Sequence, residues 1–430
     1  MINSYVPWRR LWKYLGGAAA ARAGDEMSGP ALLLLGLAVT GRPSTGSELL
    51  ASVTVAGAAG GPFFGALLDR SHRPDRVLAA TLAAYAVGIG VIAAAAGHLP
   101  MPLVVVIALT AGLFNPAVAG GWTSQLPRLV TGAELARGSA LDAMTYSTAS
   151  LAGPALAALI AAGVGARPAV IVAAALVGLA VPAASSLRRY PPAPRPGPVM
   201  TPHRQIAAGF AAIATRRPLL RATVTSVVSY AGIGMLIVCC PVLGAQRLGG
   251  AARGALLITA IAATSLAVNA VLVRRAWRGA PDIRVFVSTL IIGVSMAAAA
   301  VAPGWLVVLA VAVGGAGEGP QLTALFAVRH RETPEHMRGQ VFTTAASLKI
   351  GGMAAGAALA GPLAGRSVTS CLLIAAGIEL CAASAYLLTG RREKRSEGTA
   401  SPVADRAAAS AGPGRKVPAA GTPARSEKWS

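Results

Sequence analysis

The residues able to do chemistry in this chain include a few charged side chains that interrupt long apolar stretches. Arg22 precedes Asp25 and Glu26 by three and four residues, so a helix would place all three on one face. A charge inside a membrane-spanning helix costs at least about 2.5 kcal/mol, which makes each of them a functional candidate. Two carboxylates sharing one arginine would leave one of them able to take a proton. The alternative is a self-neutralising cluster at the membrane interface.

A second group of candidates lies in the last third of the chain. Glu318 stands among glycines that leave room for a cavity, and is the strongest single candidate for binding a proton or cation. Gln321 follows one turn later on the same face. Glu379 is a further candidate, unless it faces lipid, and Lys349 is a possible counter-ion to either glutamate. Asp142 is expected to be a gate or interface residue.

The remaining polar and aromatic residues within apolar stretches are expected to line a cavity or to anchor the packing. They are Asn115, Trp122, Gln125, Tyr146 and Tyr230. The four cysteines have no metal-ligand spacing, and neither an HExxH nor a GxxxxGK[ST] motif occurs. The sequence therefore predicts no metal, no cofactor and no enzyme.

The composition places these residues in a membrane protein. Of 430 residues, 54% are hydrophobic and only 13% are charged, whereas a typical soluble domain has about 25% charged residues. The 50 glycines suit close helix packing in lipid, and few aromatic residues disfavour a transmembrane barrel.

Runs of about 20 apolar residues predict an all-α protein with twelve membrane-spanning helices in two sets of six. The first set is expected near 14–40, 49–68, 77–97, 101–126, 139–163 and 168–187, and the second near 219–245, 254–273, 285–303, 304–328, 340–364 and 367–389. The predicted parts are an N-terminal lobe (1–187), a Pro- and Arg-rich cytoplasmic linker (188–218), a C-terminal lobe (219–390) and a disordered cytoplasmic tail (391–430).

The basic residues are distributed unevenly about these spans. Of the 38 lysines and arginines, 31 fall on the side that holds both termini and five on the other. This predicts cytoplasmic termini and a multi-pass protein of the plasma membrane, which is expected to be the inner membrane of a bacterium. The net charge of +22 thus reflects topology and does not indicate nucleic-acid binding.

Loose internal repeats support two related halves. Asn115-Pro116 and Gly153-Pro154 recur in outline as Gly319-Pro320 and Gly361-Pro362, with offsets of about 204 and 208 residues. Gly153, Pro154, Gly319 and Pro320 are expected to bend or pack helices.

One loop carries a family resemblance. Between the second and third spans the sequence reads Gly65-Ala-Leu-Leu-Asp69-Arg70-Ser-His-Arg73-Pro-Asp-Arg76. It resembles the G-x-x-x-D-R-x-x-R-R/K loop of the major facilitator superfamily. The Gly24-Asp25 pair, the ELARGS segment and Gly153-Pro154 look like the drug-exporter branch, which includes multidrug and macrolide efflux-type proteins.

The resemblance implies a gate. It implies that Asp69 contacts the start of the eleventh span near Arg338 and Gly339 and holds the inner side shut. Asp69 can also face a helix N-terminus in one access state only, while Gly65 allows close helix approach. The alternative is that Arg70, Arg73 and Arg76 only enforce topology.

The sequence as a whole predicts a monomeric secondary transporter in the lipid bilayer. The expected activity is efflux of an amphiphilic small molecule, a drug or metabolite, as a proton antiporter. The alternatives are a proton-coupled uptake permease and a transporter-like protein that has lost transport.

Overall fold

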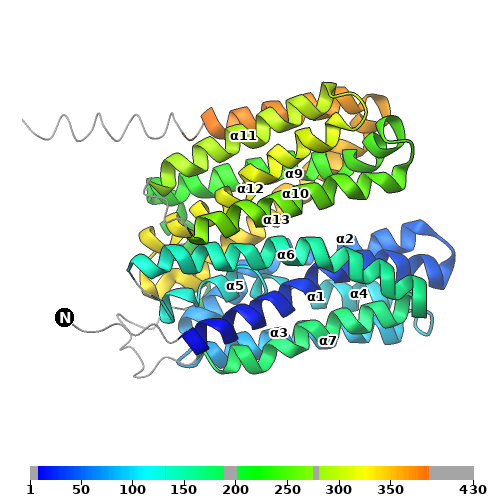
Figure 1. Cartoon of the computed structure of the whole chain (residues 1–430). Helices are drawn as coiled ribbons and strands as arrows, with labels where there is room; N and C mark the ends of the chain where they lie inside the picture. Colours follow the sequence, from blue (N-terminus) through cyan, green and yellow to red (C-terminus); the bar gives the residue numbers. More distant parts are fainter. Residues whose placement is uncertain (1–7, 131, 188–200, 275–279, 385, 387–430) are drawn as a thin grey trace, which may run out of the picture. The chain divides into compact units, whose positions relative to one another are not determined.

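The structure is a computed structural model and describes residues 8–130, 132–187, 201–274, 280–384 and 386. These residues are almost entirely helical and contain no β-strand beyond one isolated bridge between Ala96 and Leu99 (Figure 1). The predicted all-α fold is confirmed. The expected tail at 391–430 lies outside the described residues.

The first lobe is built from long helices joined by short turns. It contains α1 (Trp8–Thr40), α2 (Pro43–Arg70), α3 (Pro74–Ala95), α4 (Met101–Gly112), α5 (Gly120–Thr123), α6 (Ala133–Val164) and α7 (Ala166–Ser185). Pro43 and Pro74 are the first residues of α2 and α3. A backbone amide at this position would have no acceptor within the helix, so proline costs no hydrogen bond there. Gly41 and Gly165 take positive φ angles of 68° and 105°, which allows the chain to reverse between adjacent helices.

The second lobe has the same character. It contains α9 (Arg217–Arg247), α10 (Gly254–Arg274), α11 (Pro281–Val301), α12 (Leu306–Glu332), α13 (Arg338–Arg366) and an apolar helix over Val368–Ser384. The described part of the predicted linker also contains α8 (Pro202–Thr215). At 14 residues this helix is shorter than the roughly 20 residues needed to span a bilayer.

The twelve expected spans all correspond to helical segments. Nine segments of the described chain are long and apolar enough to cross a membrane. The other three expected spans correspond to α1, α13 and the helix Val368–Ser384. The charged residues Arg22, Asp25 and Glu26 interrupt the apolar run of α1.

The fourth span is not the continuous helix that its hydropathy predicts over 101–126. Helix α4 ends at Gly112, and the chain continues through short 3-10 turns at Asn115–Ala117 and Leu126–Arg128 with α5 between them. Pro116 lacks an amide hydrogen, which favours a break at this point. The break places Asn115 beside α1, where it contacts Asp25. Pro320, the counterpart of Pro116 in the repeat, lies inside the unbroken α12.

Separate apolar clusters stabilise the two lobes. One cluster draws its buried residues from Leu11 through Leu187, and another from Tyr230 through Ala376. A smaller cluster joins the lobes, because Ala143 of α6 packs with Phe326 of α12 and Phe342 of α13.

The lobes also meet along α2 and α13, where glycines allow close approach. A Cβ atom added at Gly61 or Gly65 would collide with α13. The Thr343 hydroxyl donates to the carbonyl oxygen of Gly61 (2.7 Å), and the Ser347 hydroxyl donates to that of Gly57 (2.7 Å). This packing fixes the register in which Asp69, at the end of α2, meets the start of α13.

Candidate functional site

The Asp69 carboxylate binds the N-terminus of α13. The amides of Gly339 and Gln340 donate to its two oxygens at 2.8 and 2.7 Å. These amides lie in the first helical turn, where no intrahelical acceptor is available and the helix dipole favours an anion. A Cβ atom at Gly339 would lie 2.6 Å from Asp69 Oδ1, so a larger residue would displace the carboxylate. We call this contact the clasp.

The basic residues around the clasp have different surroundings. Arg338 and Arg128 add positive potential at Asp69. Arg73 pairs with Asp75 at 3.0 Å, which links the loop to the first turn of α3. Arg70 is half-buried and Arg76 is exposed. The contact between Asp69 and Gly339 has the geometry that the resemblance implies, while Arg76 lies on the surface.

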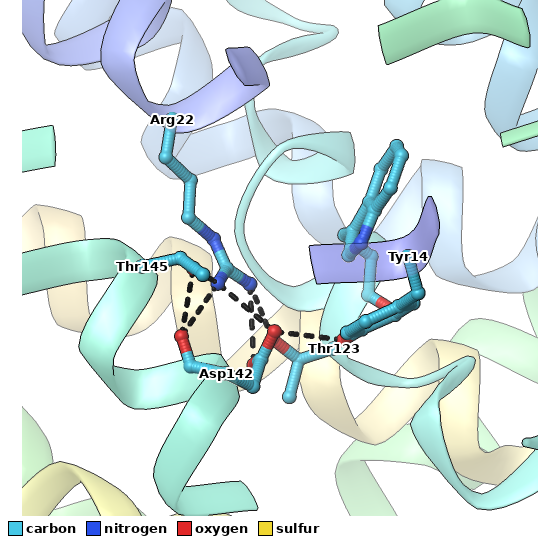
Figure 2. Close-up of polar contacts among 6 residues, drawn as sticks. Tyr14, Arg22, Thr123, Asp142 and Thr145 are labelled. Carbon is cyan, nitrogen blue, oxygen red and sulfur yellow. Dashed lines mark hydrogen bonds and ion pairs between the residues drawn. The ribbon is translucent and has the colours of Figure 1, made fainter. Parts of the chain in front are cut away.

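Arg22 is buried in the first lobe and is paired with Asp142 of α6 (Figure 2). Its Nη1 and Nη2 atoms donate to the two carboxylate oxygens at 2.9 and 3.2 Å. Thr123 Oγ1 accepts from Nη2 at 2.9 Å, and Tyr14 donates to Asp142 at 2.8 Å. The guanidinium also lies 3.7 Å from the centroid of the Tyr146 ring. This buried cation is therefore compensated by charge and by hydrogen bonds.

This arrangement corrects the expectation that Arg22 neutralises Asp25 and Glu26. The helical spacing puts the three residues close in sequence, but packing against α6 brings Asp142 to the arginine instead. It also gives Asp142 a definite role as the counter-ion of Arg22, beyond that of a gate or interface residue. Asp25 and Glu26 are left without this cation.

Asp25 and Glu26 are held by neutral groups. The Tyr85 hydroxyl and the Asn115 amide each donate to Asp25 Oδ1 at 2.6 Å. The Ser150 hydroxyl donates to Glu26 Oε1 at 3.1 Å. Neither carboxylate forms an ion pair within the described part of the chain, and both are only half-buried.

Glu318 and Lys349 extend this group of charges into the second lobe. Lys349 Nζ lies 4.2 Å from the centroid of the Tyr230 ring and 5.6 Å from that of Tyr146. Glu318 and Glu26 attract Lys349 electrostatically from the two lobes, but no ion pair joins them within the described residues. The predicted counter-ion thus lies near Glu318 and is held mainly by aromatic rings.

Gln321 and Glu379 lie away from Lys349, in a hydrogen-bond network inside the second lobe. Gln321 Nε2 donates to Ser229 at 3.1 Å and to Thr289 at 2.8 Å, and Ser229 donates to Glu379 at 2.9 Å. Both Gln321 and Glu379 are fully buried, so Glu379 does not face lipid. Glycines 232 and 293 lie against the Glu379 side chain and leave it room.

The predicted helix-packing glycines lie beside functional candidates. A Cβ atom at Gly153 would lie 2.8 Å from that of Glu26, so the glycine lets α6 approach α1 at this carboxylate. A Cβ atom at Gly319 would lie 2.7 Å from the Ser265 carbonyl oxygen of α10. Pro154 and Pro320 follow them within the continuous helices α6 and α12.

A narrow pocket lies between the lobes, with room for about one water molecule. Tyr146 of α6 lines it from the first lobe. The second lobe contributes Phe326 and Arg329 from α12 and Phe342 and Lys349 from α13. We call it the interlobe pocket.

The helical fold, the lobe contacts and the charged residues agree with one known family. Residues 14–349 match the model of the Major Facilitator Superfamily. The chain belongs to this superfamily. Within it, an uncharacterised MFS-type transporter, y4rN of Sinorhizobium fredii (strain NBRC 101917 / NGR234), is 27% identical over 389 residues. The match covers 88% of this chain and 94% of that protein.

Solved structures of superfamily transporters share the fold. The human organic anion transporter MFSD10 (TETRAN) has a TM-score of 0.70 and 16% identity, over 88% of this chain and 99% of that one. The E. coli fucose:proton symporter FucP (N162A) has a TM-score of 0.64 and 14% identity, over 90% and 98%. The family indicates a multi-pass membrane transporter and not an enzyme.

Arg329 is a site residue that the sequence of this superfamily member does not reveal. The predicted spans leave Arg329 in a loop at 329–338, whereas α12 continues to Glu332 and only 3% of Arg329 is exposed. His330 is also buried, with its ring centroid 4.5 Å from that of Phe342. The apolar residues Leu325, Phe326 and Val328 before Arg329 are the signal that would have extended the helix.

The remaining candidates predicted to line a cavity or to anchor the packing lie in different places. Tyr146 lines the interlobe pocket and Tyr230 contacts Lys349. Trp122 and Gln125 are instead buried, and Trp122 packs on Tyr14 with ring centroids 5.8 Å apart.

Proposed function

We propose that this superfamily transporter is a secondary active exporter of an amphiphilic small molecule, driven by proton entry, as in the drug-exporter branch. The observation that carries the proposal is the group formed by Asp25, Glu26 and Glu318. These carboxylates lie within electrostatic range of Lys349, and none has an ion-pair partner among the described residues.

A physical reason links these carboxylates to protons. An ionised carboxylate without a cation is costly at membrane depth, and binding a proton removes that charge. Lys349 opposes proton binding electrostatically, so any movement of the lobes that changes its distance from the carboxylates changes their proton affinity. Proton binding and lobe movement are coupled in this way.

The clasp supplies the second element of alternating access. Asp69 belongs to the first lobe and the start of α13 to the second, so separating the lobes at this end breaks both hydrogen bonds. In the proposal the Asp69 end faces the cytoplasm, as the basic residues predict. Both termini are then cytoplasmic, the chain acts as a monomer, and the domains are 1–187, 188–218, 219–390 and 391–430.

Two competing functions differ in observable ways. An uptake permease would move substrate into the cell along with protons. A protein that has lost transport should also lose the membrane carboxylates and the clasp, yet Asp25, Glu318 and Asp69 are all present.

The proposal is tested by transport into inverted membrane vesicles with an imposed pH gradient, using a panel of amphiphilic compounds. We expect accumulation that collapses when an ionophore removes the gradient. Accumulation only in right-side-out vesicles would indicate uptake. No gradient-dependent flux of any compound would contradict the proposal.

The orientation is tested separately with reporters fused after Ser430 and inside the 188–218 linker. Both should report the cytoplasm. A signal from the opposite side at either site would overturn the topology.

A further inference from the structure

The interlobe pocket contains a buried cation, Arg329, for which the described residues supply no counter-ion. Arg329 is 97% buried, and its Nε and Nη2 atoms have no hydrogen-bond partner in the described part of the chain. No carboxylate forms an ion pair with Arg329 among the described residues. A buried guanidinium without an anion is costly, since it has lost its water and gained no opposite charge.

Other arginines in the described chain show what compensation looks like. Arg22, equally buried, has Asp142 at 2.9 Å. Arg331, two residues after Arg329, pairs with Asp282 at 2.8 Å. Both of these arginines therefore have an acidic partner, whereas none of the acids in the described ranges pairs with Arg329.

A second cation lines the same pocket. Lys349 is held over the tyrosine rings and is half-buried. Between the two cations the lining is aromatic and apolar, with Tyr146, Phe326 and Phe342. Flat apolar rings next to cationic donors suit a ligand with an aromatic body and one anionic group.

We propose that Arg329 and Lys349 bind the anionic group of an aromatic organic anion, which is the substrate class of this transporter. The inference rests on the proposed transport function and specifies its substrate. In the present arrangement the pocket is too narrow for such a ligand, so the lobes must separate before it enters. Arg329 becomes accessible when they do.

The uncompensated arginine then has a mechanistic use. Closing the lobes over an empty pocket buries Arg329 without an anion, whereas closing them over the substrate buries a neutralised pair. The loaded carrier closes more readily than the empty one. An inside-negative membrane potential also drives an anion outward, the direction of the proposed export.

The test measures binding without any gradient, so that its result is independent of proton coupling. Three nearly isosteric probes are titrated calorimetrically into the purified full-length protein at constant ionic strength. They are 2-naphthoate, 2-naphthamide and 2-naphthamidinium, which carry one negative, no and one positive charge. We expect 2-naphthoate to bind at least ten-fold more tightly than the other two.

Variants assign this preference to the pocket. Arg329→Gln should reduce the preference for 2-naphthoate to less than three-fold, and Arg329→Lys, which keeps the charge, should retain most of it. Arg331→Gln changes the exposed neighbour and should bind like the wild type. Because Arg329→Gln removes a costly charge, it is expected to fold.

Several outcomes would overturn the proposal. Equal or absent binding of the three probes by the wild type excludes an aromatic anion. Unchanged preference in Arg329→Gln places the anion elsewhere. Displacement of 2-naphthoate by phosphate or sulfate at equal concentration indicates a site for inorganic anions. A normal binding result together with gradient-independent transport would reject proton coupling and leave this inference intact.

Discussion

The first lobe and the interlobe pocket each bury an arginine, and they treat it in opposite ways. Arg22 is surrounded by Asp142, Thr123 and Tyr14, which accept its hydrogen bonds or hold its partner in place. Arg329 lies beside the aromatic rings of Tyr146, Phe326 and Phe342, and no acceptor bonds to its Nε or Nη2 atom within the described residues. Since both side chains are at least 97% buried, exposure does not explain the difference.

The contrast separates a structural charge from a functional one. A compensated pair within one lobe remains satisfied whether the lobes open or close, so it holds α1 against α6 throughout transport. An uncompensated charge between lobes changes its environment with every opening. The energy of burying such a charge depends on whether an anion occupies the pocket, whereas the energy of the Arg22–Asp142 pair does not.

The largest effect is expected from removing Asp142, the counter-ion of the buried Arg22. Asp142→Ala leaves Arg22 buried without a counter-ion, which costs about 3–5 kcal/mol. We expect little monodisperse protein on size-exclusion chromatography and a large loss of thermal stability. The matched control is Asp282→Ala, because Asp282 is 20% exposed and its arginines can reach water. If Asp142→Ala is as stable as this control, Arg22 is compensated by its neutral partners alone.

The next largest effect concerns the carboxylates beside the pocket. Glu318→Gln permanently mimics the protonated form, so we expect loss of gradient-driven export with substrate binding retained. Asp25→Asn and Glu26→Gln are measured beside it in inverted vesicles. Normal export by Glu318→Gln together with failure of one α1 variant would move the proton site to α1. Normal export by all three would reject coupling through these residues.

A smaller effect on export is expected from weakening the clasp, which holds the lobes together in the state that buries Arg329. Asp69→Asn removes the charge that faces the α13 N-terminus, and we expect export to fall about ten-fold, equivalent to about 1.4 kcal/mol. Membrane insertion and expression should persist. Asp75→Asn, in the same region but bonded only locally to Arg73, should export at nearly the wild-type rate. Wild-type export by Asp69→Asn would leave the neighbouring arginines as topology markers only.

Much of the fold follows from the sequence because membrane burial imposes a simple length rule. Each predicted span has its helical counterpart, and the Asp69 loop predicts its contact with Gly339 through the family resemblance. The break at Asn115 escapes the hydropathy pattern, since apolar residues continue through it while Pro116 interrupts the hydrogen bonds.

The charged partners are harder to predict than the helices. Helical spacing pairs Arg22 with Asp25 and Glu26, yet its partner Asp142 lies 120 residues away on α6. Which face of α6 meets α1 depends on the packing of both helices, and Gly153 shows how one small residue decides that approach. Arg329 was missed for a related reason, because basic residues near a span end usually mark a loop.

The most direct measurement compares the thermal unfolding of the wild type with that of Arg22→Gln and Arg329→Gln in the same detergent without ligand. Arg22→Gln leaves Asp142 buried and unpaired, so its Tm should fall by about 6 °C or more. Arg329→Gln removes a charge that no described acid compensates, so its Tm should rise by about 2–4 °C. A fall in Tm for Arg329→Gln as large as that for Arg22→Gln would contradict the distinction between a compensated and an uncompensated arginine.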